Sequence, residues 1–153
     1  MSPLPERFGF YAILTAPLVG YDALAKLCVH YNVPFLQLRI KEVGNDDILA
    51  VAKRIRNITR DSETLLIIND EVDIAVEVEA DGVHVGQTDA PVEFVREKMG
   101  QGAIVGLSTH NVEQIRLAQD IKPDYLGIGP VFSTPSKKIP DPFIGIEGLR
   151  DML

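Results

Sequence analysis

The chain has little thiol chemistry available to it, since it contains a single cysteine. Cys28 has no second cysteine with which to form an internal disulfide. Its setting in the segment ALAKLCVHY predicts a small buried residue on a helix rather than a nucleophile. We therefore expect a reducing, cytoplasmic location.

Long apolar runs and an excess of positive charge are also missing. No apolar run is long enough to span a bilayer, and the first residues, MSPLPERFGF, lack the apolar core of a signal peptide. The 15 Lys and Arg residues are outnumbered by 22 Asp and Glu residues, which gives a net charge of −7. This balance argues against a nucleic-acid or membrane surface, so a site for an anion must gather its few cations locally.

What the sequence does contain is a regular alternation of apolar strands and amphipathic helices, which predicts an α/β protein with a parallel sheet. Residues 1–153 fit one domain. The predicted strands are residues 8–14, 34–39, 64–68, 82–85, 103–107 and 125–129. The first predicted helix covers residues 21–31, the second follows a capping cluster at 45–47, and the third covers residues 71–79. The fourth lies between Pro91 and Gly100, the fifth begins at a capping box of Asn111 and Gln114, and the sixth begins near Ile146. Segment 71–79 also fits strand alternation.

These elements make six β/α units. A closed (β/α)₈ barrel has eight units and about 250 residues. The pattern is therefore that of an open doubly wound sheet, or of a barrel without its last two units.

Two carboxylates follow successive predicted strands in the stretch 65–89. Asn69 and Asp70 end one strand, and His84, Gln87 and Asp89 lie at the end of the next. Ligands of parallel sheets bind at this edge, and two carboxylates facing cations suit Mg²⁺ and a phosphorylated substrate. Alternatively, Asp70 and Asp89 each cap the helix that follows. His84 is a core histidine with satisfied hydrogen bonds or a support for the site.

Strand alternation places Gln37, Arg39 and Lys41 on one face of the second strand. An arginine and a lysine on the ligand-facing side of a buried strand need an anionic partner. That partner is either a bound substrate or a rim carboxylate such as Glu42.

The later strands supply small and hydroxyl residues. Ser108 shares a face with Gly106 and could cap a helix; no paired base is evident that would make it a nucleophile. The glycines at 106, 127 and 129 either leave room for a ligand or permit close packing. The loop 132–138 carries hydroxyls and two lysines that suit phosphate oxygens, or it is a solvated loop.

Taken together, these motifs resemble the thiamine-phosphate synthase family. The likeness rests on QLRIK at 37–41, LIIND ending at Asp70, DGVHVGQTD at 81–89, GLSTHN at 106–111 and YLGIGPVFSTPSKK at 125–138. Five motifs in order, each at the carboxyl end of a strand, are specific. The resemblance implies a TIM (β/α)₈-type barrel, of which this chain has six units.

The resemblance also implies roles for individual residues. Those that would hold the pyrimidine diphosphate are Gln37, Arg39, Lys41, Asn69 and Lys137; Ser108 would contact its pyrimidine side. Asp70 and Asp89 would bind Mg²⁺, with His84 and Gln87 supporting them, and Thr134, Pro135 and Ser136 would contact the thiazole phosphate. Among these, Ser108, Arg39 and Lys137 would take part directly in catalysis.

The chemistry that the family implies joins the pyrimidine methylene carbon to the thiazole nitrogen and releases pyrophosphate. The diphosphate departs first, and the thiazole captures the pyrimidine carbocation. We expect small-molecule substrates as the only partners other than further copies of the chain in a homo-oligomer. The sequence departs from the family in lacking strands seven and eight, so we expect the 153-residue chain to bind the pyrimidine diphosphate better than the thiazole phosphate. Two alternatives are a thiazole tautomerase, which the aspartate pair and QLRIK disfavour, and a non-catalytic truncated barrel that acts as an assembly module.

Overall fold

A computed structural model describes residues 4, 8–41, 43–133 and 142–153 of the chain. The strands are β1 (Tyr11–Leu14), β2 (Phe35–Leu38), β3 (Leu65–Asn69), β4 (Gly82–Val85), β5 (Ile104–Thr109) and β6 (Tyr125–Ile128). The helices are α1 (Tyr21–His30), α2 (Asn45–Thr59), α3 (Val72–Glu77), α4 (Val92–Met99), α5 (Val112–Ile121) and α6 (Gly145–Met152). Strands and helices alternate without exception over the described residues, as the sequence predicts.

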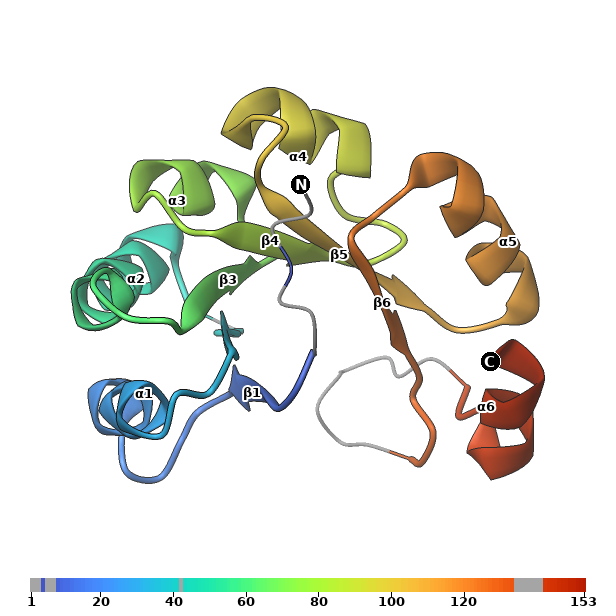
Figure 1. Cartoon of the computed structure of the whole chain (residues 1–153), viewed down its shortest axis with the longest axis horizontal. Coiled ribbons are helices and arrows are strands. Elements are labelled where there is room, and N and C mark those ends of the chain that lie inside the picture. The colour runs from blue at the N-terminus through green and yellow to red at the C-terminus, as the bar shows by residue number, and fades with distance from the viewer. Residues whose placement is uncertain (1–3, 5–7, 42, 134–141) are drawn as a thin grey trace.

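The sheet settles which α/β architecture is present. Its strand order is β1-β2-β3-β4-β5-β6, and every neighbouring pair is parallel. A doubly wound sheet reverses its strand order part-way, and this sheet does not. The sheet curls into a half-barrel with its helices along the outside (Figure 1). The barrel prediction is thus confirmed, and the doubly wound alternative is wrong.

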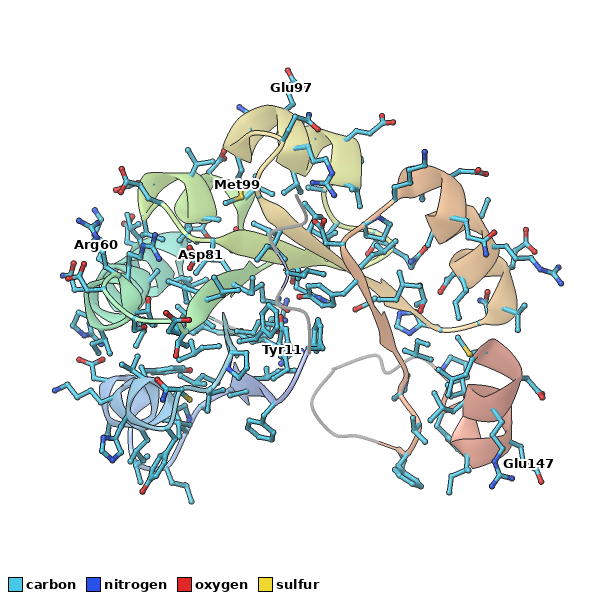
Figure 2. The ribbon with its side chains drawn as sticks, in the orientation of Figure 1. Tyr11, Arg60, Asp81, Glu97, Met99 and Glu147 are labelled. Carbon is cyan, nitrogen blue, oxygen red and sulfur yellow. The ribbon has the colours of Figure 1, made fainter. Side chains whose placement is uncertain are left out.

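Strand β2 shows how the two faces of the curled sheet are covered. All four residues of β2 are buried, because both faces of this strand are covered. Leu36 and Leu38 point outward into the core beneath the helices, where Ile55 of α2 is also fully buried. Phe35 points inward and packs with Ile67 and Ile104 in a second, smaller core. Figure 2 shows Tyr11 inside the curl, whereas Glu97 and Glu147 project outward from α4 and α6.

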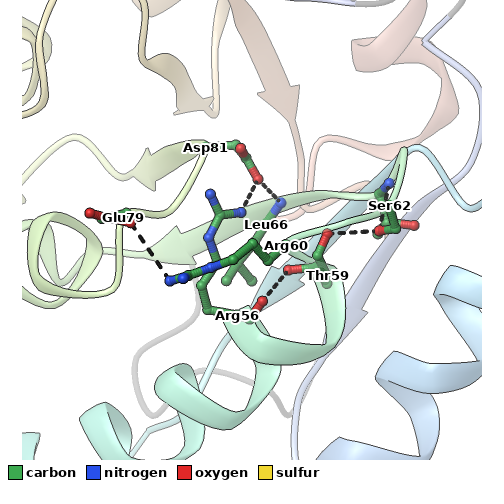
Figure 3. A network of polar contacts seen from close by, with 8 residues as sticks. Arg56, Thr59, Arg60, Ser62, Leu66, Glu79 and Asp81 are labelled. Atoms are coloured by element: carbon green, nitrogen blue, oxygen red, sulfur yellow. Dashed lines mark hydrogen bonds and ion pairs between the residues drawn. The ribbon is translucent and has the colours of Figure 1, made fainter.

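A carboxylate clamp ties neighbouring units together at the amino-terminal edge of the sheet. Asp81 Oδ2 accepts hydrogen bonds from the Leu66 backbone N–H at 2.7 Å and from Arg56 Nη1 at 3.0 Å (Figure 3). A second clamp has the same distances and consists of Asp124 with the Val105 backbone N–H and Arg96 Nη2. In each clamp one oxygen anchors a strand and a helical arginine, away from the carboxyl-terminal edge where ligands bind.

Several local predictions need correction. The first strand begins at Tyr11 rather than at residue 8, and Phe8 instead stacks on Phe35 with ring centroids 4.5 Å apart. The predicted cap at 45–47 is wrong, because Asn45 is already the first helical residue and Gly44 stands at the N-cap without a side-chain bond. Asn111 does cap α5, accepting a hydrogen bond from the Gln114 N–H at 2.9 Å.

Two other sequence predictions are confirmed. The ambiguous segment 71–79 contains a helix, α3, with three buried apolar residues. Cys28 is 5% exposed and packs in the core beneath the helices, as expected of a small hydrophobe. No helix in the described part of the chain is long and apolar enough to cross a membrane.

Candidate active site

A pocket of about 710 Å³ opens inside the curl of the sheet, where the strands end. It is lined by every predicted site residue that lies on β2 to β5 or just after one of these strands, except Gln87: Gln37, Arg39, Lys41, Asn69, Asp70, His84, Asp89 and Ser108. Gln87 reaches the site indirectly, because its side-chain N–H donates to the Ser108 carbonyl oxygen. Thr134, Pro135, Ser136 and Lys137 lie outside the described residues. The volume suits a small-molecule ligand.

The three polar residues of QLRIK share the pocket because of strand alternation. Gln37 is 3% exposed and donates from Nε2 to the Tyr11 hydroxyl at 2.9 Å. Arg39 and Lys41 follow on the same side, beyond the end of β2. Lys41 Nζ forms an ion pair with Asp70 Oδ2. The ion-pair alternative therefore holds for Lys41, but its partner is a pocket carboxylate; Glu42 lies outside the described residues.

Neither pocket aspartate caps a helix. The N-cap of α3 is Glu71 and that of α4 is Pro91, both without a side-chain cap bond. Asp70 instead adopts a left-handed backbone conformation with φ of 62°, which Asp tolerates better than most residues. Asp89 Oδ2 accepts the Gly86 N–H at 2.8 Å. The capping alternative is wrong for both residues, and their carboxylates are left for the pocket.

The two carboxylates interact with each other electrostatically. Burial raises the pKa of Asp70, and the neighbouring Asp89 charge raises it further, while the hydrogen bond from Lys41 opposes both effects. A carboxylate whose ionisation is disfavoured by burial and by a neighbouring acid is a suitable place for a cation. Among the described residues, however, no group of three or more His, Cys, Asp or Glu side chains could hold a metal. A divalent cation here would need most of its ligands from water or a bound substrate.

Ser108 has a histidine partner that the sequence did not reveal. His84 Nε2 lies 2.9 Å from Ser108 Oγ, and His84 Nδ1 lies 3.0 Å from the Tyr125 hydroxyl. The Tyr125 hydroxyl is in turn 2.6 Å from that of Tyr11. A histidine therefore lies within hydrogen-bond distance of Ser108, and His84 is not merely a core residue.

The glycine at position 106 explains how this contact forms. In the sheet register, Gly106 of β5 lies between His84 of β4 and Tyr125 of β6. A Cβ at Gly106 would overlap both the Tyr125 ring and His84 Nδ1. Gly82 is similarly closed by the backbone of Ile104. At these positions the glycines permit close packing of protein atoms rather than making room for a ligand.

A comparison with models of protein families shows which family contains this chain. The family model described as thiamine monophosphate synthase matches residues 13–153. The chain belongs to this family. All the predicted site residues lie within the matched region, and the resemblance inferred from the five motifs is confirmed.

Individual members of the thiamine monophosphate synthase family are similar to this chain over most of its length. The chain is 44% identical over 154 aligned residues to the thiamine-phosphate synthase of Roseiflexus sp., with 98% of this chain covered, and 39% identical over 151 residues to that of Archaeoglobus fulgidus. A solved structure of thiamine phosphate pyrophosphorylase from Pyrococcus furiosus superposes with a TM-score of 0.78 at 32% identity, covering 94% of this chain. The chain spans 65% of the Roseiflexus protein, 70% of the Archaeoglobus protein and 68% of the Pyrococcus structure.

Tyr11 and Tyr125 are the pocket residues that sequence reasoning missed. Each is the first residue of its strand, and each points inward, where its ring is partly buried against the small core of Phe35, Ile67 and Ile104. Burial raises the pKa of Tyr11 to about 12 and also raises the pKa of Tyr125. The sequence feature that could have identified them is a tyrosine at an inward-facing strand position. The sequence does not show, however, that a residue of β1 and a residue of β6 meet across the barrel.

Proposed function

We propose that this chain forms the catalytic pocket of a thiamine-phosphate synthase. The reaction joins 4-amino-2-methyl-5-(diphosphooxymethyl)pyrimidine to 4-methyl-5-(2-phosphooxyethyl)thiazole and releases pyrophosphate. The methylene C–O bond to the diphosphate breaks, and a C–N bond to the thiazole forms. The observation that carries the proposal is one pocket in which Arg39 and Lys41 face the carboxylates of Asp70 and Asp89.

The cationic side of the pocket suits the diphosphate. Arg39 presents a planar donor set that matches phosphate oxygens, and Lys41 adds a compact positive charge. Asn69, at the end of β3, adds amide donors. The chain as a whole carries a net charge of −7, yet these cationic and amide groups lie together on one wall of the pocket. They would stabilise the diphosphate group, which gains negative charge as it leaves as pyrophosphate.

The carboxylate side suits Mg²⁺. Asp70 and Asp89 would hold the ion, and its charge would offset the burial and the neighbouring Asp89 charge that raise the pKa of Asp70. When bound, Mg²⁺ would neutralise charge on the leaving pyrophosphate. With no third protein ligand among the described residues, the diphosphate oxygens are expected to complete its shell.

The rest of the pocket suits the pyrimidine. Phe8, Tyr11 and Tyr125 form an aromatic wall, with Tyr11 and Tyr125 ring centroids 5.6 Å apart, and Ser108 offers a hydroxyl beside it. Such a wall holds a planar ring in a fixed orientation, which limits the motions that separate reactants. The cytoplasmic location and a homo-oligomeric state also remain predictions.

The test measures binding before turnover. The 153-residue chain is titrated with the pyrimidine diphosphate by calorimetry in Mg²⁺, and thiazole phosphate is then added while thiamine phosphate and pyrophosphate are quantified. We expect saturable binding of the diphosphate and equal amounts of the two products. Lys53→Ala, which removes an ion pair with Glu77 on the outer helices, should leave binding unchanged and serves as control. A chain that is folded but does not bind the pyrimidine diphosphate would overturn the proposal.

A further inference from the structure

Four pocket side chains connect Ser108 to the opposite wall of the barrel through hydrogen bonds. The contacts run from Gln37 Nε2 to the Tyr11 hydroxyl (2.9 Å), to the Tyr125 hydroxyl (2.6 Å), to His84 Nδ1 (3.0 Å), and from His84 Nε2 to Ser108 Oγ (2.9 Å). We call these five residues the relay. It joins β2, β1, β6, β4 and β5, so it exists only in the folded barrel.

The direction of the relay follows from its first residue. The Gln37 side-chain nitrogen can only donate, so the Tyr11 oxygen accepts there and its proton is directed to Tyr125. The Tyr125 proton then goes to His84 Nδ1. A neutral histidine that accepts at Nδ1 carries its proton on Nε2, so His84 donates to Ser108 Oγ.

The opposite direction is less favourable. If Ser108 donated to His84, each proton would shift one step toward Gln37, and the Tyr11 proton would meet an N–H group. Among the described residues, Tyr125 is the one hydrogen-bond acceptor that the Tyr11 hydroxyl reaches. A partly buried hydroxyl without an acceptor is destabilising, because the hydrogen bond that it loses to water is not replaced. Burial also raises the pKa of both tyrosines, so each keeps its proton at neutral pH.

We propose that Tyr125 and His84 are positioning residues. Tyr125 holds His84 as the Nε2–H tautomer, and His84 donates to Ser108 Oγ, so that the Ser108 hydroxyl donates its hydrogen bond into the pocket, to an acceptor atom of the substrate's heteroaromatic ring. His84 is then a hydrogen-bond donor to Ser108 and does not act as its base. This inference rests on the proposed function for the identity of the ring. The aromatic wall beside Ser108 favours a planar ring there, while the diphosphate lies toward Arg39.

The first test needs no substrate. Nitrogen-15 NMR of the side chain of His84 in the parent chain should show a pyrrole-type Nε2 and a pyridine-type Nδ1. Tyr125→Phe keeps the ring that packs over Gly106 but removes the donor to Nδ1, so the Nε2–H preference should weaken or reverse. A parent His84 protonated on Nδ1 would overturn the proposal.

The second test separates the relay from general folding and from the proposed function. Tyr125→Phe should weaken binding of the pyrimidine diphosphate about five- to tenfold and leave binding of inorganic pyrophosphate unchanged. Ser108→Ala should do the same, and the double variant should be no weaker than Ser108→Ala alone, because Tyr125 acts through Ser108. Additive losses, or equal losses for pyrophosphate, would refute the relay. If the folded parent binds neither ligand, the proposed function fails instead.

Discussion

Lys41 and Asp70 form an ion pair between the ends of two neighbouring strands, so one of the two candidate metal ligands already has a cationic partner. A metal that binds Asp70 must compete with Lys41, unless an anion arrives to engage the lysine. We therefore predict that Mg²⁺ binds weakly to the chain alone and much more tightly with pyrophosphate present. Calorimetric Mg²⁺ titrations with and without pyrophosphate measure this difference.

The aspartate variants give the control for that titration. Asp70→Asn and Asp89→Asn should each abolish the enhancement by pyrophosphate. Asp61→Asn, on an exposed surface residue, should not change it. Tight Mg²⁺ binding without pyrophosphate that survives Asp70→Asn would place the metal elsewhere.

Arg39 is expected to carry much of the diphosphate affinity. Arg39→Ala removes charge-assisted hydrogen bonds in a partly buried pocket and should weaken pyrophosphate binding by about 2 kcal/mol. Arg39→Lys should restore only part of the affinity, because lysine lacks the planar donor set. Isothermal titration measures both variants against Lys53→Ala. Undiminished binding by Arg39→Ala would show that Arg39 has a structural role.

Asp81 and Asp124 are predicted to matter for stability and not for binding. Asp81→Ala leaves the Leu66 N–H and the Arg56 guanidinium without their partner, in a region where Arg56 is only 15% exposed. The free energy of unfolding should fall by about 2 kcal/mol. Asp61→Ala should change it by less than about 0.5 kcal/mol. Urea unfolding measures this, and a loss of pyrophosphate affinity in folded Asp81→Ala would contradict the assignment.

Gly82 and Gly102 form a matched pair for testing close packing. An alanine at Gly82 would run into the Ile104 backbone, whereas nothing lies within 4 Å of a Cβ at Gly102. We expect Gly82→Ala to destabilise the chain by about 2 kcal/mol through overpacking, and Gly102→Ala to be near neutral. Equal melting temperatures of the two variants would show that β4 and β5 separate easily.

The Tyr11 hydroxyl predicts how stability changes at alkaline pH. Its pKa is raised from 10.0 to about 12 in the folded chain, mainly by burial. Between these values the unfolded chain loses a proton that the folded chain keeps, so the free energy of unfolding falls as pH rises through this window and is fully retained below it. Tyr11→Phe should reduce that fall by roughly 2 kcal/mol. Urea unfolding at pH 9 to 12, a window set by the two pKa values, measures this fall for the parent chain and for Tyr11→Phe. Identical pH profiles of the two proteins would contradict the prediction.

The sequence by itself determined the alternating architecture and most of the pocket. Strand alternation alone placed Gln37, Arg39 and Lys41 on the ligand side, because side-chain direction in a strand depends only on parity. The carboxylates of Asp70 and Asp89 were found because they follow apolar strands directly. These features are local, and local rules suffice for them.

Only the tertiary structure decided which groups meet. The sequence allowed Asp70 to cap a helix, but its left-handed backbone and its ion pair with Lys41 direct the carboxylate into the pocket. The contacts of His84 with Ser108 and Tyr125 span 24 and 41 residues of chain. They depend on strand register and on the missing side chain at Gly106, and no local pattern encodes the distance between residues that far apart.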